Sequence, residues 1–490
     1  MYVGVNKNFM RAKIIFILCL AASQFGFSQA GYKLDFQIKG LKDTTIYLGY
    51  YYGESTYIKD TARVNNIGAF TFEGKQALSQ GVYFLVLNKT KPYADFVVGQ
   101  SQNFMMETTS DNFIKNMKVT GDEDNRLFFE NMVYNMDRNK EAEPFIKIMR
   151  DSTLKEDQKK EARAAHAKIN DKVMAHQSEL IAKYPATMTA RIFKAIKPIV
   201  IPDPPKKADG TTDSTFQLKY YRAHFFDNFD LADDALIRLP NPLYQQKVGE
   251  YLDKLFLPQA DTIVDEIKKL AARTKKNQET YKYLVYSCMF KYQNPEIMGL
   301  DEVFVHLYDI YFASGEMDYW VNPASKQGFK DYADKIRLSM LGKTAPNLTM
   351  QDANLQPKSL YDIKKKYTII FFFDPDCGHC REETPKLVNF YKKNNLKYNV
   401  EVFAVSADTS MKKMRDYIAE MKMPWITVNG PRSYTNQHYS KLYYAETTPT
   451  IYILDDKKKI IAKKPPVEKI EGFLENYEKS LKRKVVQKGS

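Results

Sequence analysis

Apolar and polar residues alternate along several short stretches in the first quarter of the chain. Leu34 and Phe36 fall on one face of a strand, and Ile46 with Leu48 repeats the pattern. Such alternation, broken at intervals by Gly, Asn and Asp, is typical of strands that bury one face in a sheet. Residues 31–120 are therefore predicted to form an antiparallel, sandwich-like β domain.

The apolar spacing becomes helical after Thr120-Gly121-Asp122, a segment that ends the strands and offers a helix N-cap. Residues 154–184 form a long, charged and amphipathic stretch, whereas residues 201–214 are rich in Pro, Gly and Lys. The first stretch predicts a long helix, and the second predicts an exposed loop. We expect residues 121–335 to form an all-α middle domain.

A continuous apolar run, Ile369 to Phe373, interrupts this helical pattern and has lysines on one side and Asp374 on the other. A short run with polar ends indicates a fully buried central strand. Asp374 precedes Pro375, and the residue before a proline avoids helical angles, so the strand should end in a short loop. A helix is expected to begin near Cys377, directly after this loop.

The rest of the C-terminal sequence switches between strand and helix patterns. This order predicts an α/β domain, residues 341–485, built around the buried strand. The predicted strands are 400–405, 425–428, 450–454 and 460–461, and the predicted helices are 410–421 and 470–481.

The candidate chemistry lies in two cysteines, Cys377 and Cys380, at the start of the predicted helix. Free N–H groups and the positive end of the helix dipole favour a thiolate there, so the pKa of Cys377 should be depressed. Cys377 is then the attacking nucleophile, and Cys380 resolves the mixed disulfide. The redox-active Cys377–Cys380 disulfide makes a separate cofactor unnecessary. No metal site is predicted, because the sequence offers no second CxxC or HxxxH motif to complete a zinc site.

Three neighbouring side chains should tune this pair. His379 lies between the cysteines and, when protonated, favours the thiolate, whereas Asp376 directly before Cys377 opposes it. Glu383 lies three residues after Cys380 and hence on the same helix face. If Glu383 is buried, its pKa rises and it can exchange a proton with Cys380.

These motifs resemble the TlpA/ResA branch of envelope thiol–disulfide oxidoreductases, which have the thioredoxin fold and overlap with AhpC/TSA proteins in sequence. The resemblance rests on Cys377-Gly378-His379-Cys380, Glu383, Pro385 and Thr447-Thr448-Pro449-Thr450-Ile451. It implies that Pro449 follows a cis peptide bond and that Thr448 offers backbone hydrogen bonds to the substrate chain. It also implies that Glu383 serves the cysteines.

Three positions depart from related proteins. Asp376 occupies the place of the tryptophan commonly found just before the first cysteine. Phe371 occupies the place of a buried aspartate of thioredoxin, and Asp374 occupies the place where peroxiredoxins need a threonine. Peroxidase chemistry is therefore rejected. The β and helical stretches resemble uncharacterised modules that precede thioredoxin domains in envelope proteins, and they add architecture but no activity.

Charge and the N-terminal end indicate where this chemistry takes place. The 490 residues carry a net charge of +14 at pH 7, but the basic residues are dispersed among acidic ones, and no nucleic-acid-binding motif accompanies them. Residues 1–30 have the charged start, short apolar stretch and small residues of a secretory signal peptide. No other segment is apolar enough to span a membrane. We expect export to the periplasm or cell envelope of a Gram-negative-type bacterium.

The expected function is disulfide exchange with protein clients of the envelope, most simply as a reductase fed by a membrane electron donor. Two alternatives remain open. In the first, the protein is a binding or scaffold protein whose front domains capture a peptide or glycan. In the second, it is a disulfide isomerase whose cysteine pair acts on misbridged proteins.

Overall fold

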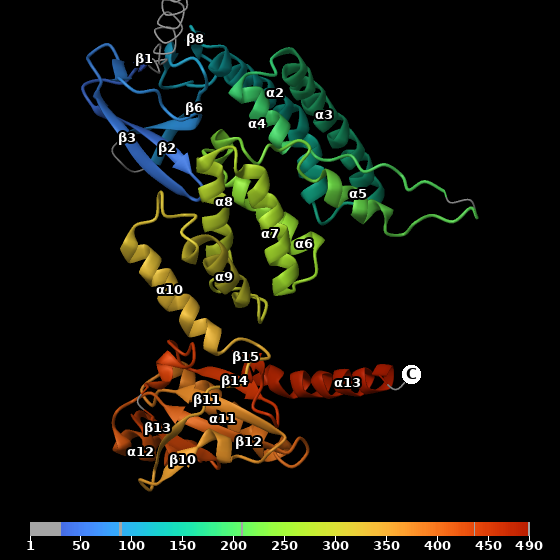
Figure 1. Ribbon diagram of the computed structural model, residues 1–490. Coiled ribbons are helices and arrows are strands. Elements are labelled where there is room, and N and C mark those ends of the chain that lie inside the picture. The colour runs from blue at the N-terminus through green and yellow to red at the C-terminus, as the bar shows by residue number, and fades with distance from the viewer. Residues whose placement is uncertain (1–30, 88–90, 207–208, 436, 489–490) are drawn as a thin grey trace, which may run out of the picture. The chain divides into compact units, whose positions relative to one another are not determined.

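The computed structural model describes residues 31–87, 91–206, 209–435 and 437–488 (Figure 1). The predicted signal peptide, residues 1–30, lies outside the described residues. The chain divides into two compact units, one ending at Tyr251 and the other beginning at Leu252. Among the described residues, no helix combines the length and the apolar character needed to cross a membrane.

The first unit begins with two four-stranded sheets, of order β4-β1-β7-β8 and β3-β2-β5-β6, which share one apolar core. Alternate side chains fill this core as predicted, and Leu34, Phe36 and Leu48 are at most 2% exposed. β1 pairs with β7 in parallel, a feature that the alternation did not predict. The strands are β1 (Tyr32–Lys39), β2 (Thr45–Tyr52), β3 (Ser55–Arg63), β4 (Ala69–Gly74), β5 (Gly81–Leu87), β6 (Lys91–Val98), β7 (Asn103–Thr109) and β8 (Lys118–Thr120).

Helices follow the sheets in the chain, and the first of them is hydrogen-bonded to β6, the edge strand of one sheet. The Asp122 carboxylate caps α2 by accepting a hydrogen bond of 3.0 Å from the N–H of Asn125, as predicted. The Asn125 amide bonds both the N–H and the carbonyl of Val97 in β6, each at 2.7 Å. The helices are α2 (Glu123–Arg150), α3 (Glu156–Lys183), α4 (Met188–Ile196), α5 (Phe216–His224) and α6 (Leu243–Leu255), with a short η1 (Asp234–Ile237) before α6.

The second unit begins with helices packed around buried aliphatic side chains. Cys288 lies among them and is 2% exposed, and burial raises its pKa to about 12. It is therefore an unreactive core thiol. The helices are α7 (Ala260–Thr274), α8 (Gln278–Lys291), α9 (Asp301–Leu307), the π-helical η2 (Tyr308–Ala313) and α10 (Pro323–Leu338).

A seven-stranded mixed sheet of order β10-β9-β13-β12-β11-β14-β15 completes the second unit. The interior strand β11 runs parallel to β12 and antiparallel to β14. The strands are β9 (Thr349–Asp352), β10 (Pro357–Ser359), β11 (Tyr367–Phe373), β12 (Val400–Ser406), β13 (Ile426–Ser433), β14 (Thr450–Leu454) and β15 (Ile460–Lys463). The helices are α11 (Gly378–Asn394), α12 (Met411–Met421) and α13 (Ile470–Lys488), with short turns η3 (Leu360–Asp362), η4 (Tyr439–Lys441) and η5 (Val467–Lys469).

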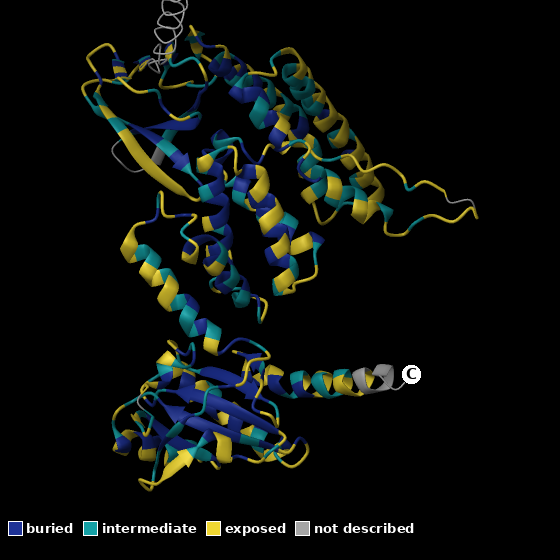
Figure 2. Ribbon diagram, in the orientation of Figure 1, coloured by how far each residue is buried: buried dark blue, intermediate teal, exposed yellow. Residues whose placement is uncertain are grey.

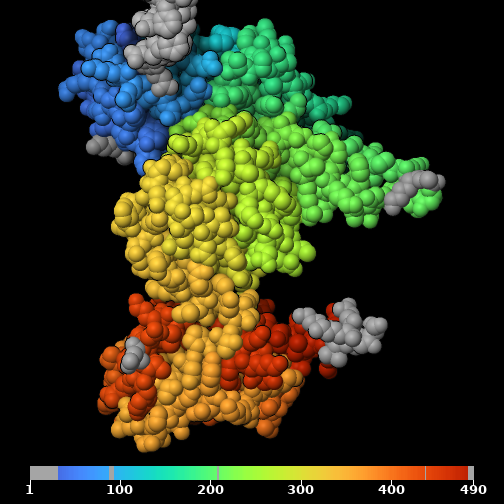
Figure 3. Space-filling view, in the orientation of Figure 1, coloured from blue at the N-terminus to red at the C-terminus, as the bar shows by residue number. Residues whose placement is uncertain are grey.

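All seven residues of β11 are buried, because apolar cores cover the sheet on both faces (Figure 2). Phe371 and Phe373 point into the core that contains Cys380 and residues of α11, α12 and α13. Phe372 points into the opposite core, which residues before β11 and around η4 complete. Figure 3 shows the elements of this sheet and its helices in orange and red. The structure thus confirms a multidomain chain of β sheets, helices and a C-terminal α/β fold.

Candidate active site: the cysteine pair and the proline loop

The two cysteines lie at the start of α11, a few residues after the carboxyl end of β11. Cys377 is the N-cap residue of this helix, and its sulfur accepts a hydrogen bond of 3.3 Å from the N–H of Cys380. The Cys380 sulfur accepts a bond of 3.5 Å from the N–H of Asp374. Both thiols are free in this structure. The backbone therefore donates a hydrogen bond to each sulfur, as expected for cysteines at a helix N-terminus.

The two thiols differ in their environment and in their acidity. Partial burial raises the pKa of Cys377, but hydrogen bonds from the Cys380 thiol, the Cys380 N–H and the Thr448 side chain outweigh it, so the pKa lies below the ordinary value of 9.0. Cys380 is fully buried, and burial raises its pKa to about 12. This contrast favours Cys377 as the nucleophile and leaves Cys380 protonated at neutral pH.

A second loop reaches the reactive sulfur. The Thr448–Pro449 peptide bond is cis, as the resemblance implies. The Cys377 thiol donates a hydrogen bond of 3.3 Å to the carbonyl of Thr448. The loop that should align a substrate chain therefore lies in direct contact with the cysteine that should attack it.

Two aspartates just before Cys377 form a carboxylate cluster with Asp408, and a lysine neutralises the cluster in part. Oxygens of Asp374, Asp376 and Asp408 lie within 4.8 Å of one another, an arrangement that can ligate a cation. The ammonium of Lys413 in α12 lies 2.5 Å from Asp376 and 3.3 Å from Asp408. Lys413 therefore supplies a counter-charge to Asp376, and a tuning role for Asp376 at Cys377 remains a prediction.

Glu383 and His379 have different surroundings. The Glu383 side chain is 22% exposed, and its carboxylate lies 2.6 Å from the ammonium of Lys386, which also contacts Glu468 at 2.5 Å. No hydrogen bond joins Glu383 to either cysteine sulfur in the described part of the chain. His379 is 85% exposed and lies 3.8 Å from Glu382. A proton-transfer role for Glu383 and a tuning role for His379 remain predictions.

Two buried residues behind the cysteines were not predicted from the sequence. The Thr384 hydroxyl donates a hydrogen bond of 2.8 Å to the carbonyl of Cys380 and lies 2.8 Å from the Tyr417 hydroxyl. The Tyr417 ring stacks on Phe373 with centroids 5.0 Å apart. Thr384 follows Glu383 directly and carries a weak local signal, whereas Tyr417 comes from α12 and carries none.

Comparison with known families covers most of the chain. Residues 341–463 match the model of the AhpC/TSA family. Residues 202–331 match a domain of unknown function, DUF5106, and residues 32–128 match a second one, DUF4369. The two front matches carry no assigned activity.

Individual relatives agree with the match at the C-terminal end. Tryparedoxin of Trypanosoma brucei brucei is 29% identical over 118 residues, which make up 24% of this chain and 81% of that protein. Thiol-disulfide oxidoreductase ResA of Bacillus subtilis is 24% identical over 120 residues, which make up 24% of this chain and 64% of that protein. A solved domain of a possible thiol-disulfide isomerase from Cytophaga hutchinsonii is 40% identical, with a TM-score of 0.28, and the match covers 29% of this chain and 97% of that one.

Other relatives are matched over a smaller part of their length. The chain spans 23% of probable nucleoredoxin 1 of Arabidopsis thaliana. The family match, the order of strands and helices and the cysteine pair at the carboxyl end of β11 lead to one assignment. Residues 341–463 belong to the AhpC/TSA family and form a thioredoxin-fold domain like that of the thiol–disulfide oxidoreductases.

Proposed function

We propose that this protein is an exported thiol–disulfide oxidoreductase that reduces disulfides of envelope proteins through Cys377 and Cys380. The contrast between the two thiols carries the proposal: Cys377 has a lowered pKa and contacts the Thr448 carbonyl, whereas Cys380 is buried with a raised pKa. The AhpC/TSA match supports the chemistry. Export is proposed from the sequence of residues 1–30.

The disulfide exchange proceeds in two steps, formation of a mixed disulfide and its resolution. The Cys377 thiolate attacks one sulfur of a client disulfide, a mixed disulfide forms, and the second client sulfur leaves as a thiolate. Cys380 then loses its proton and attacks the Cys377 sulfur, which releases the first client sulfur and forms the Cys377–Cys380 disulfide. Two electrons pass from the cysteine pair to the client, and a membrane electron donor restores the pair.

The neighbouring residues assist these steps. Glu383 accepts the proton of Cys380 before the second attack, because this thiol is protonated at neutral pH. Asp376 and His379 adjust how readily the Cys377 thiolate forms. Thr448 and Pro449 align the client backbone beside Cys377, since the Thr448 carbonyl already lies 3.3 Å from that sulfur.

Substitution of each cysteine tests the proposal. Cys377→Ser should abolish insulin reduction, because no nucleophile remains to form the mixed disulfide. Cys380→Ser should retain the attack and accumulate envelope proteins bound to Cys377, which non-reducing gels and mass spectrometry would detect. Retained insulin reduction in Cys377→Ser, or no trapped protein in Cys380→Ser, would rule out this mechanism.

The direction of electron flow is tested by the reduction potential of the Cys377–Cys380 pair, measured by equilibration with dithiothreitol or glutathione. A value near about −270 mV, the thioredoxin range, supports a reductase. A value between about −180 and −120 mV would instead make the protein an isomerase or an oxidase.

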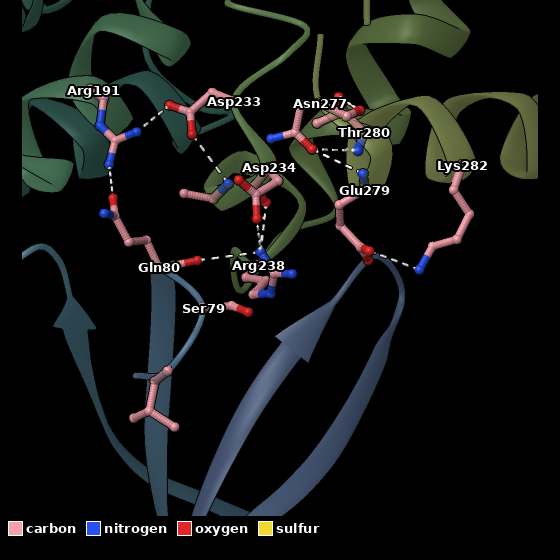
Figure 4. A network of polar contacts seen from close by, with 12 residues as sticks. Ser79, Gln80, Arg191, Asp233, Asp234, Arg238, Asn277, Glu279, Thr280 and Lys282 are labelled. Atoms are coloured by element: carbon pink, nitrogen blue, oxygen red, sulfur yellow. Dashed lines mark hydrogen bonds and ion pairs between the residues drawn. The ribbon is translucent and has the colours of Figure 1, made fainter. Parts of the chain in front are cut away.

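A cavity in the first unit supports a second candidate function, capture of a peptide or glycan. The cavity has a volume of about 1080 Å³ and is lined largely by amide, hydroxyl and charged side chains. Arg191 lies on its wall and bonds Asp233 at 2.8 Å and the Gln80 side chain (Figure 4). If capture is the main function, a strain with Cys377→Ser and Cys380→Ser should keep its phenotype, whereas deletion of residues 31–335 should abolish it.

A further inference from the structure

A smaller cavity lies within the second unit, beside the thioredoxin-fold sheet. Its volume is about 370 Å³, which is at the lower end of the range for small-ligand sites and fits one or two side chains. One wall is the segment 293–299 between α8 and α9, and the opposite wall is the segment 463–466 after β15. Tyr444, Lys469 and Phe473 complete the lining.

The cavity adjoins the loop that contacts the reactive sulfur. Tyr444 lies four residues before Thr448 in the chain. Lys464 donates its backbone N–H to the carbonyl of Ile451, which lies two residues after Pro449, at 2.6 Å. Because an extended chain advances about 3.3 Å per residue, the cavity wall lies about 10 Å along the strand from Thr448. An extended client bound beside Thr448 can reach it within a few residues.

The lining carries two lysines that have no ion-pair partner within the described residues. The ammonium of Lys464 lies over the Tyr444 ring, 4.1 Å from its centroid, where partial burial lowers its pKa although much of the side chain is accessible. Lys469 is exposed at the rim. The lining carboxylates are Asp301, which is paired with the buried Lys463, and the exposed Glu296. The free positive charge of the cavity therefore favours an anionic occupant.

The rest of the lining is mixed, with the amide side chains Gln293 and Asn294 beside apolar ones. Pro466 is exposed and Phe473 is half-buried, whereas Ile297 and Met298 are 49% and 37% exposed. Accessible apolar and amide side chains next to cationic groups suit a protein segment better than an inorganic anion, because a segment brings an acid, an apolar side chain and backbone polar groups.

We propose that this cavity selects acidic clients by binding an extended segment next to the client disulfide. An Asp or Glu about three to five residues from the client cysteine lies between Lys464 and Lys469, and a neighbouring apolar side chain contacts Pro466 and Phe473. This inference rests on the thiol–disulfide exchange proposed above and names the class of protein that the site prefers.

The test uses the full chain in its reduced form and peptides that carry one cysteine in a disulfide with glutathione. The peptides form matched pairs, with Glu-Glu or Gln-Gln at the fourth and fifth positions before or after the cysteine. The acidic residues can meet the lysines from only one side of the cysteine. For that peptide pair, we expect kcat/KM of the Glu-Glu peptide to exceed that of its Gln-Gln partner by about three- to tenfold at low salt. This ratio should fall as salt screens the charges.

Two protein variants test whether the preference for the Glu-Glu peptide comes from the lysines of the cavity. The double variant Lys464→Gln with Lys469→Gln should bring the ratio close to one, and the Gln-Gln peptide serves as the internal reference for each protein. Lys457→Gln, at an exposed lysine in the turn before β15, is the matched control and should keep the wild-type ratio.

The possible failures are distinguishable. Loss of reduction of every peptide and of insulin by the wild-type protein would contradict the proposed function itself. Active reduction with a wild-type ratio of one, or a ratio unchanged in the double variant, would overturn the docking inference alone. If the double variant does not fold, a wild-type ratio that is insensitive to salt would overturn it as well.

Discussion

Charged side chains close to Cys377 in the chain are expected to act on its thiolate. Asp376 precedes the cysteine directly, and its carboxylate forms a cluster with those of Asp374 and Asp408. Lys413 compensates them, and these contacts, with Asp376 first, raise the pKa of Lys413 itself. We therefore expect a lysine 36 residues further along the chain, which the CGHC motif does not include, to add to the hydrogen bonds that lower the pKa of Cys377.

Substitution of this lysine should weaken the nucleophile. In Lys413→Met the carboxylates lose their counter-charge, so the pKa of Cys377 should rise and less thiolate should be present at a given pH. The pH profile of iodoacetamide alkylation should move to higher pH, with a rate at pH 7 about two- to fivefold lower. Lys412→Met, at a neighbouring exposed lysine paired with Asp416, is the control. An unchanged profile in Lys413→Met would show that Lys413 does not act on the thiolate.

The Cys380 thiol must lose its proton before the second step of the exchange can occur. With a pKa near 12, this thiol needs a base before it can attack the mixed disulfide. Glu383→Gln should therefore leave the first attack unchanged and slow resolution about tenfold or more. Stopped-flow kinetics with an excess of a disulfide substrate separates the two steps. Glu382→Gln, one residue earlier and 73% exposed, should resolve at the wild-type rate. Equal resolution rates in both variants would remove Glu383 from the mechanism.

At the scale of elements, α11 and α12 together hold the cysteine turn in place. The Thr384 hydroxyl connects the carbonyl of Cys380 in α11 to the Tyr417 hydroxyl in α12, and both side chains are at most 1% exposed. A hydroxyl pair at such depth is retained only if it is hydrogen-bonded. The contact therefore links the position of Cys380 to the packing of α12 on the sheet.

Removal of the Thr384 hydroxyl should lower the free energy of unfolding. Thr384→Val keeps the shape but leaves the Tyr417 hydroxyl buried without this partner, so the free energy of unfolding should fall by about 1–3 kcal/mol. Thr384→Ser retains the hydroxyl and should lose less. Urea denaturation of both variants measures the difference. Equal stability of Thr384→Val and the wild-type protein would show that the hydrogen bonds contribute nothing.

At the scale of the whole molecule, the sequence predicted features formed by consecutive residues better than contacts between residues far apart in the chain. The continuous apolar run predicted β11 as a buried strand from consecutive residues, whereas the place of Thr448-Pro449 beside Cys377, 71 positions away, came from the family resemblance. Lys413 and Tyr417 were missed because they reach the site through the packing of α12. The parallel pairing of β1 with β7 was also missed, since alternation gives a strand but not its partner.

The contact between Asp301 in α9 and Lys463 in β15 is another long-range feature. The two side chains form an ion pair and are 14% and 5% exposed, and the N–H of Lys463 also contacts the Met298 sulfur at 3.2 Å. Nothing in the sequence pairs these residues, which lie 162 positions apart. A buried pair contributes little net stability but is strongly destabilising when one partner is removed, because the remaining charge has no counter-ion.

Asp301→Asn should therefore lower the free energy of unfolding of the second unit by about 3–5 kcal/mol, whereas the double variant Asp301→Leu with Lys463→Met should recover most of that loss. Chemical denaturation of the full chain measures both. Asp309→Asn is a matched control, because it breaks an exposed pair with Arg337 and should cost less than about 1 kcal/mol. If the single and double variants are equally unstable, the loss comes from packing between α9 and β15. If only the single variant is unstable, the loss comes from the charge of Lys463 that is left buried without a counter-ion.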